Sequence, residues 1–158
     1  MTNSRSYIVY IINLRGELLM ITLYSYFNLI SKMESKKRTD FRVFNSCGGE
    51  LTVDDYSQYS NNDIVNIRFE RKSPYLYITF IYLSDTKSSI ADNSTKIQFS
   101  EMMDIVETSG VLMIPIRPEW SNPDFKFENT LPVNDTITSM TPIFTHFGTF
   151  LTVDLAQR

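Results

Sequence analysis

The chain has very few of the side chains on which catalysis near neutral pH depends. Its 158 residues include one histidine, His146, and one cysteine, Cys47. The sequence holds no glycine-rich phosphate loop and no cluster of metal ligands. Because enzymes commonly use groups that change protonation or bind a metal near neutral pH, this composition predicts a protein that is not an enzyme and carries no cofactor or metal. We expect its function to depend on surfaces and partners.

Ordinary structural roles fit Cys47 and His146 better than the roles of nucleophile and base. The two residues are far apart in the sequence, and neither lies in a recognisable nucleophile motif. We expect Cys47 to be a small residue in or near the core. We expect His146 to be a strand residue that packs beside Phe144 and Phe147.

The chain also lacks cysteine pairs and long apolar runs. A single cysteine excludes an intramolecular disulfide and fits a reducing compartment such as the cytoplasm. The apolar stretch 7–30 is cut by Arg15, Gly16 and Glu17 into pieces too short to span a bilayer. No small-residue cleavage site typical of a signal peptide follows its first part. The sequence therefore predicts a chain without a transmembrane segment.

What the chain does contain suits one aromatic-rich domain. At this length a single domain buries roughly two-thirds of the surface of the unfolded chain. The hydrophobic content is 42% and the aromatic content 13%, with nine Tyr and eleven Phe, which favours strands over helices. No internal repeat is visible in the sequence. We predict one α+β domain over residues 1–158, mainly an antiparallel sheet backed by about two helices.

Hydrophobic periodicity predicts a helix and several strands in the first half. Leu23, Tyr26, Phe27 and Ile30 share one helical face, and Thr22 can cap the start of that helix. The segment 75–83 is apolar on both faces, which predicts a central strand that forms a hairpin with the strand before it. The expected strands are 7–13, 41–47, 64–70, with Val65, Ile67 and Phe69 inward, and 75–83.

The remaining segments are more polar. Residues 48–63 are acidic and poor in aliphatic side chains, which predicts a mobile loop. We expect a second helix capped by Ser100 and stopped at Gly110, followed by a segment 111–116 that Pro115 confines to a sheet edge. A proline-interrupted region is expected over 118–142. One alternating strand is expected over 143–153, with a bulge at Gly148.

Basic side chains gather where the first helix meets the next strand. The net charge is −3 overall, yet residues 1–72 have ten Lys and Arg against eight Asp and Glu, and residues 73–158 have five against ten. Each well-placed cation contributes roughly 1 kcal/mol at an anionic membrane surface, so the cluster could contact lipid or RNA. A solvated helix end with lysines that suit the helix dipole explains the same residues. The cluster consists of Lys32, Lys36, Lys37, Arg38 and Arg42.

Trp120 is a candidate partner anchor. It is the only tryptophan and lies in a polar, proline-bounded segment. Surface tryptophans are enriched among interface hot spots, although a tryptophan can equally close the core. Four tyrosines could stack on single-stranded nucleic acid, but sheet packing is their more ordinary role. These are Tyr56, Tyr59, Tyr75 and Tyr77.

The order of elements resembles the globular domain of rhabdovirus matrix proteins. The resemblance is carried by the helix TLYSYFNLISKMES, the strand FRVFNSCGG, the strand YITFIYLSDTKSS and the later segment FSEMMDIVETSGVLMI. The segment DIVNIRFERKSPYLYITF is also similar to a hairpin in the smaller matrix proteins of related negative-strand viruses. The likeness is one of pattern and rests on no invariant motif.

The resemblance implies a viral structural protein of virion assembly. Such a protein self-associates as a homo-oligomer, condenses the nucleocapsid, and contacts anionic membrane and RNA through basic residues, in the host cytoplasm or the virion. No small-molecule substrate is expected. The chain contains no PPxY or P-T/S-A-P sequence, so recruitment of host budding machinery is not implied. The alternative interpretation is a viral host-interaction or RNA-silencing-suppressor module that captures one host protein or RNA.

Overall fold

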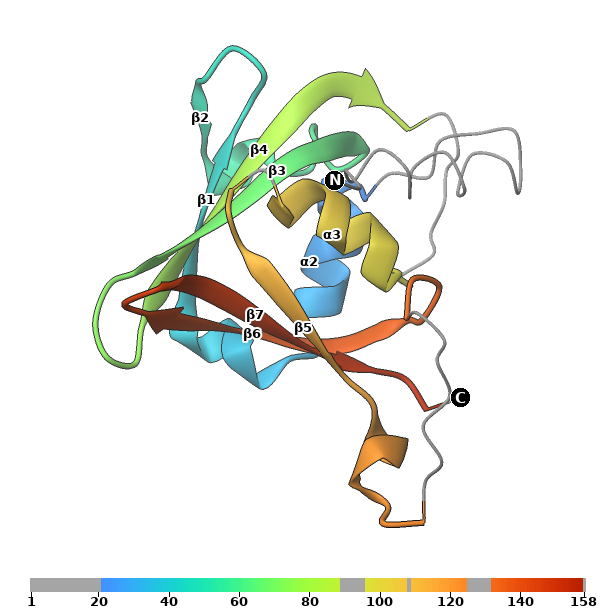
Figure 1. Cartoon of the computed structure of the whole chain (residues 1–158). Coiled ribbons are helices and arrows are strands. Elements are labelled where there is room, and N and C mark those ends of the chain that lie inside the picture. The colour runs from blue at the N-terminus through green and yellow to red at the C-terminus, as the bar shows by residue number, and fades with distance from the viewer. Residues whose placement is uncertain (1–20, 89–95, 108, 125–131, 158) are drawn as a thin grey trace.

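The computed structural model describes residues 21–88, 96–107, 109–124 and 132–157. They form an α+β fold with two helices and two mixed, mostly antiparallel sheets, so the predicted class is confirmed and one expected sheet becomes two (Figure 1). The strand predicted over 7–13 lies outside the described residues. Within them, no helix has the length and apolar character needed to cross a membrane.

The first sheet is built around the predicted central hairpin. Its strand order is β2 (Glu50–Leu51), β1 (Thr39–Phe44), β4 (Tyr77–Lys87) and β3 (Asn62–Arg71). β3 and β4 are antiparallel, and β1 runs parallel to β4 on the other side. β4 is thus central, as its two apolar faces predict.

The second sheet corrects the prediction of a single strand over 143–153. Its order is β5 (Leu112–Ile116), β7 (Gly148–Leu155) and β6 (Ile137–Thr145), with β6 and β7 antiparallel and β5 parallel to β7. The chain reverses at His146 and Phe147, between the paired residues Thr145 and Gly148. Pro115 lies in β5, which is an edge strand as predicted.

The first helix begins as predicted and ends earlier. In α2 (Leu23–Ile30), Thr22 Oγ1 accepts a hydrogen bond from the Ser25 backbone N–H at 3.1 Å, and Ser25 Oγ accepts one from the Thr22 N–H at 3.0 Å. This reciprocal cap satisfies two donors that the first turn leaves free. The helix ends at Ser31, so the lysines expected at its C-terminus follow it, two of them in a separate 3₁₀ turn, η1 (Glu34–Arg38).

The second helix starts before its predicted cap. α3 (Phe99–Glu107) already includes Ser100, which is buried in the first turn. Glu101 Oε1 instead accepts a hydrogen bond from the Gln98 backbone N–H at 2.9 Å. Gly110 follows the helix with φ +74°, a left-handed conformation that suits glycine.

The two halves of the chain repeat one arrangement, which the sequence does not reveal. Each half is a helix, a strand and a hairpin, and in each sheet the first strand runs parallel to the last strand of the hairpin. The residue before each helix bridges the start of its hairpin, Thr22 with Asp63 and Gln98 with Thr136. The repeat is therefore one of structure, and it is not visible in the sequence.

A shared β-bulge strengthens this equivalence. The register shifts between Ile64 and Asn66 in β3 and between Ile137 and Ser139 in β6. The bulge also corrects a prediction, because it leaves Val65 exposed while Ile64 is buried.

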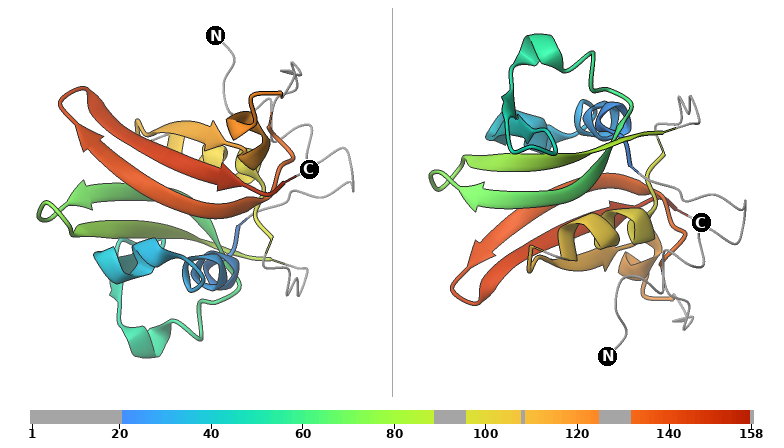
Figure 2. Two further views of the ribbon diagram at one scale, coloured as in Figure 1. Left: turned by 90° about the horizontal axis from the view of Figure 1, so that it is seen from below. Right: turned by 90° about the horizontal axis from the view of Figure 1, so that it is seen from above.

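The two repeats hold each other through equivalent serines. Ser35 Oγ, after α2, donates to the Met140 carbonyl of β6, and Ser109 Oγ, after α3, donates to the Ile67 carbonyl of β3, both at 3.0 Å. The helices also lie between the repeats, since α3 packs on β3, and α2 contacts both β3 and β6. Such reciprocal contacts are typical of a pseudo-two-fold relationship. Both hairpin turns consequently lie at the same end of the molecule (Figure 2).

The segment 48–63 is more ordered than its composition predicts. It contains β2 and the 3₁₀ turn η2 (Val53–Asp55), which Thr52 and Asp55 close with a capping box. The Tyr56 ring packs against Phe27, with ring centroids 5.4 Å apart, and Leu51 is buried. Tyrosines thus supply the apolar contacts that a count of aliphatic side chains misses.

Candidate functional site

The predicted basic cluster is divided between two surfaces. Lys36, Lys37 and Arg38 lie together in η1, and Lys32 is exposed just after α2. Arg42 lies apart from them, on the outer face of the first sheet. Three of the predicted basic residues therefore lie together in η1, and Arg42 is not part of that group.

Arg42 lies on a surface where the arginine side chains are paired with glutamates and packed on aromatic rings. It pairs with Glu50, and its guanidinium carbon lies 5.5 Å from the centroid of the Phe44 ring. Arg68 pairs with Glu70 and lies 4.2 Å from the centroid of the Phe80 ring, which is buried beneath the two arginines. Both arginines therefore already have a carboxylate partner and an aromatic neighbour among the described residues.

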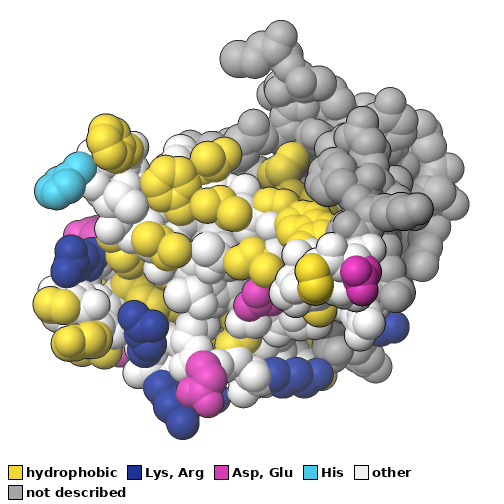
Figure 3. Space-filling model, turned by 60° about the horizontal axis from the view of Figure 1, so that its bottom comes forward, with side chains coloured by type: hydrophobic (Ala, Val, Ile, Leu, Met, Phe, Trp, Pro, Cys, Tyr) yellow, Lys and Arg dark blue, Asp and Glu magenta, His cyan; other side chains and the backbone are white. Residues whose placement is uncertain are grey.

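The end of the molecule with both hairpin turns exposes large apolar side chains. In the β3–β4 turn Tyr75 is 77% exposed and Leu76 is 45% exposed, and in the β6–β7 turn Phe147 is 96% exposed. We call the turn residues 72–76 and 145–148 the hairpin end. In Figure 3 yellow hydrophobic and dark blue basic side chains lie together at the left edge, where the two turns are. Apolar tips beside cations are typical of proteins that dip into a membrane interface.

A groove of about 350 Å³ runs behind the hairpin end. It lies between the β3–β4 turn and β6, and its walls combine polar and apolar surface, of which the polar part is the larger. We call it the arginine groove, since it has two guanidinium groups in its lining. The residues that define it are Arg38, Arg71, Tyr75, Leu76, Ile143 and Phe144.

The two groove arginines differ from the others in the described part of the chain. Arg42, Arg68 and Arg117 each pair with a carboxylate within 4.0 Å. Arg38 and Arg71 have no such partner among the described residues; their Nε groups donate to carbonyls of the β3–β4 turn, at 3.3 and 3.5 Å. A groove with two guanidinium groups and no acid to neutralise them is suited to an anion.

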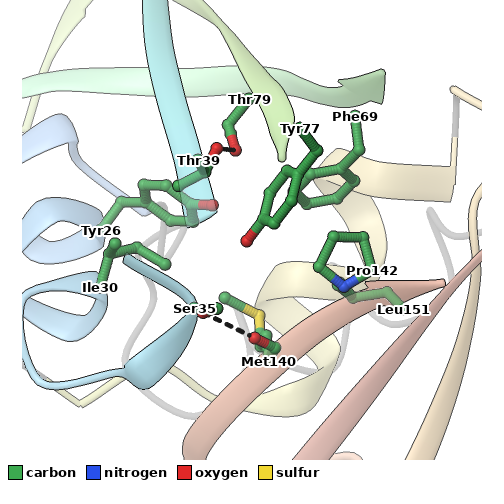
Figure 4. Close-up of a pocket in the computed structure, with 10 residues that line it drawn as sticks. All are labelled: Tyr26, Ile30, Ser35, Thr39, Phe69, Tyr77, Thr79, Met140, Pro142 and Leu151. Atoms are coloured by element: carbon green, nitrogen blue, oxygen red, sulfur yellow. Dashed lines mark hydrogen bonds between the residues drawn. The ribbon is translucent and has the colours of Figure 1, made fainter. Parts of the chain in front are cut away.

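An interior cavity beside the groove is structural. It lies where the two repeats meet, between α2, β4 and β6, and has a volume of about 10 Å³, near the lower limit for one water molecule (Figure 4). Ser35 bonds Met140 and Thr39 bonds Thr79 along its wall. Burial raises the pKa of Tyr77, which lines both the cavity and the groove, against the opposing effect of nearby Arg38. The cavity has no room for a substrate.

The sequence roles assigned to Cys47 and His146 are wrong. Cys47 is exposed in the turn after β1, and His146 is exposed in the β6–β7 turn. The structure places them in separate turns and not in a shared pocket. Among the described residues no group of three His, Cys, Asp or Glu side chains could hold a metal ion.

Trp120 lies in η3 (Pro118–Ser121) and is 39% exposed. Its ring centroid is 5.7 Å from the guanidinium carbon of buried Arg117. The side chain thus covers the end of β5 while keeping one part in solvent, and its role as a partner anchor stays a prediction.

Sequence reasoning missed the hairpin end as a unit. Tyr75 and Phe147 are far apart in the chain, and only the pseudo-two-fold arrangement brings their turns to one end.

Comparison with known protein families, curated proteins and solved structures finds no match to this chain.

Proposed function

We propose that this chain is a non-enzymatic protein that binds the surface of an anionic membrane through its hairpin end. The observation that carries the proposal is the exposure of Tyr75 and Phe147 in two turns at one end of the molecule. Tyr75 lines the groove that contains Arg38 and Arg71, which have no carboxylate partner among the described residues. A two-residue turn is normally polar, whereas here Phe147 is 96% exposed and shares one end of the molecule with exposed Tyr75 and Leu76. Apolar side chains gathered at one end in this way mark an interaction surface, and insertion into lipid would bury them.

The expected energies suit reversible binding. Burying a phenylalanine side chain contributes about 1.5–3 kcal/mol, and each basic residue near an anionic surface about 1 kcal/mol. Phe147, Tyr75 and the cations of η1 together supply a modest affinity that weakens with salt, because mobile ions screen exposed charge. The protein would lie at the interface and would not span the bilayer.

Co-sedimentation with vesicles of phosphatidylcholine and phosphatidylserine tests the proposal. We expect the double variant Tyr75→Ser and Phe147→Ser to lose binding while its thermal unfolding stays unchanged, because both side chains are exposed. The matched control is Val53→Ser, which removes an apolar side chain that is 76% exposed in η2. Equal binding by the double variant and the parent chain would contradict the proposal.

Self-association is the second component of this matrix-like function. The edge strand β5 exposes Leu112, Ile114 and Ile116 on one face, whereas the equivalent strand β1 has its edge covered by β2. Pro115 leaves the free edge of β5 without one backbone donor, so the contact between copies would be made by the exposed apolar face. Joined copies on a membrane would form a layer that could also contact a nucleocapsid.

Analytical ultracentrifugation with and without vesicles tests the self-association. We expect oligomers of the parent chain and monomers of Ile114→Lys, because a charge on the exposed apolar face of β5 opposes its burial against another copy. A parent chain that stays monomeric at all concentrations would leave the membrane module without the assembly role. Capture of one defined host protein or RNA by that monomer would favour the alternative binding module instead.

A further inference from the structure

We propose that the arginine groove binds the phosphomonoester headgroup of a lipid. The inference rests on the proposed function, since it names the lipid class that the same end of the molecule selects. It starts from the contrast among the described arginines. Three have carboxylate partners, and the two without one both line this groove.

The groove arginines are held in place by the backbone of the β3–β4 turn. Arg38 Nε donates to the Tyr75 carbonyl at 3.3 Å, and Arg71 Nε donates to the Ser73 carbonyl at 3.5 Å. Only the Nε atom of each guanidinium group is used in these bonds. The two terminal nitrogens of each group have no hydrogen-bond acceptor among the described residues and can donate to a ligand. A guanidinium fork matches the geometry of phosphate oxygens and binds them in pairs.

The charge of the groove selects among anionic headgroups. A phosphomonoester carries close to two negative charges at neutral pH, which matches two guanidinium groups. A phosphodiester or a carboxylate carries one and would leave a positive charge unmatched. Lys36 and Lys37, which adjoin Arg38 in η1, add attraction for any anionic surface but no geometry for phosphate.

The position of the groove points to a lipid and not to a free phosphate. Tyr75 and Leu76 line the groove and are also exposed apolar tips of the hairpin end. Side chains that enter the interface would therefore carry the groove to the depth of the headgroups. The volume of about 350 Å³ is enough for a phosphate and the adjoining part of a headgroup.

The test compares vesicles of equal surface potential that contain either phosphatidic acid or phosphatidylserine. We expect the parent chain to bind phosphatidic acid vesicles on the order of tenfold more tightly, because the phosphomonoester accepts charge-assisted hydrogen bonds from both arginines. The double variant Arg38→Lys and Arg71→Lys keeps both charges and should lose this preference while still binding phosphatidylserine. The matched control, Arg42→Lys and Arg68→Lys, should retain the preference, since those arginines lie outside the groove.

Three results would overturn the inference. The first is equal binding of both lipids by the parent chain, which leaves the membrane function intact and removes the headgroup selection. The second is an unchanged preference in the groove variant when its circular dichroism and thermal unfolding match those of the parent. The third is soluble glycerol 3-phosphate that binds as tightly as the vesicles, which would make a free phosphomonoester the ligand. Failure to bind either vesicle contradicts the proposed function itself and, with it, this inference.

Discussion

The ion pair between Arg117 and Asp135 provides the sharpest test of the packing. The two side chains are only 5% and 10% exposed, and they connect the residue after β5 to the segment that leads into β6. Breaking a buried ion pair by removing one partner costs about 3–5 kcal/mol, because the remaining charge loses a close opposite charge in surroundings with little solvent. We therefore predict this loss of unfolding free energy for Arg117→Ala. The total stability of a domain is only about 5–15 kcal/mol, so the loss is a large part of it.

The corresponding fall in melting temperature is about 6–20 °C for a chain of this length. Urea unfolding followed by circular dichroism measures the free energy, and Trp120 fluorescence gives a second, local signal because its ring lies over Arg117. The control is Lys72→Ala, which breaks the exposed pair with Asp40 and should cost at most about 1 kcal/mol.

A double variant separates the charge from the packing. Replacing both partners, as Arg117→Met with Asp135→Leu, removes both buried charges together and should recover much of the lost stability. If Arg117→Ala costs no more than Lys72→Ala, the pair is not the buried interaction described above and the reasoning fails.

Two further predictions concern the repeat and pH. Ser35→Ala and Ser109→Ala should each cost about 1 kcal/mol, because each removes a hydroxyl that contacts a backbone carbonyl of the other repeat; Ser109 Oγ also lies 2.5 Å from Asn66 Oδ1. A loss in only one of them, measured by urea unfolding, would contradict their equivalence. Burial raises the pKa of Asp63, so the folded chain retains a proton there that the unfolded chain has released, and stability falls as pH rises from the ordinary Asp pKa of about 3.9 towards the raised value. Asp63→Asn should therefore stabilise the protein at neutral pH but not at a pH below the ordinary Asp pKa. Thermal unfolding at these two pH values measures the gain in stability, and an equal gain at both would refute the prediction.

The sequence predicts local elements better than their pairing. The helix cap at Thr22, the two-sided apolar pattern of β4 and the edge position of Pro115 each depend on nearby residues, and the structure confirms them. The β6–β7 turn escaped prediction because His146 and Phe147 continue an apolar and polar alternation where turn residues are normally expected. The strand order of the two sheets depends on pairing between residues far apart in the chain, which local patterns do not reveal.

The internal repeat stayed hidden because its two copies differ in chemistry. In the strand register of the first sheet, Arg42 of β1 lies opposite Phe80 of β4. At the equivalent place in the second sheet, Ile114 of β5 lies opposite Thr152 of β7. One outer face is thus charged and aromatic and the other aliphatic. Comparable burial patterns persist only on the inner faces, where many side chains can fill similar space. The arginine groove combines residues of both repeats, so no local motif marks it.

Insertion of the hairpin end into lipid is the central claim, and tryptophan fluorescence measures it most directly. In a Trp120→Phe background, Phe147→Trp places the only tryptophan at the tip of the β6–β7 turn. We predict that its emission shifts to shorter wavelength on anionic vesicles and is quenched by lipids with brominated acyl chains, while Val53→Trp in the same background shows neither change. An emission from the Phe147→Trp variant that neither shifts nor is quenched, on vesicles that the protein binds, would contradict the account.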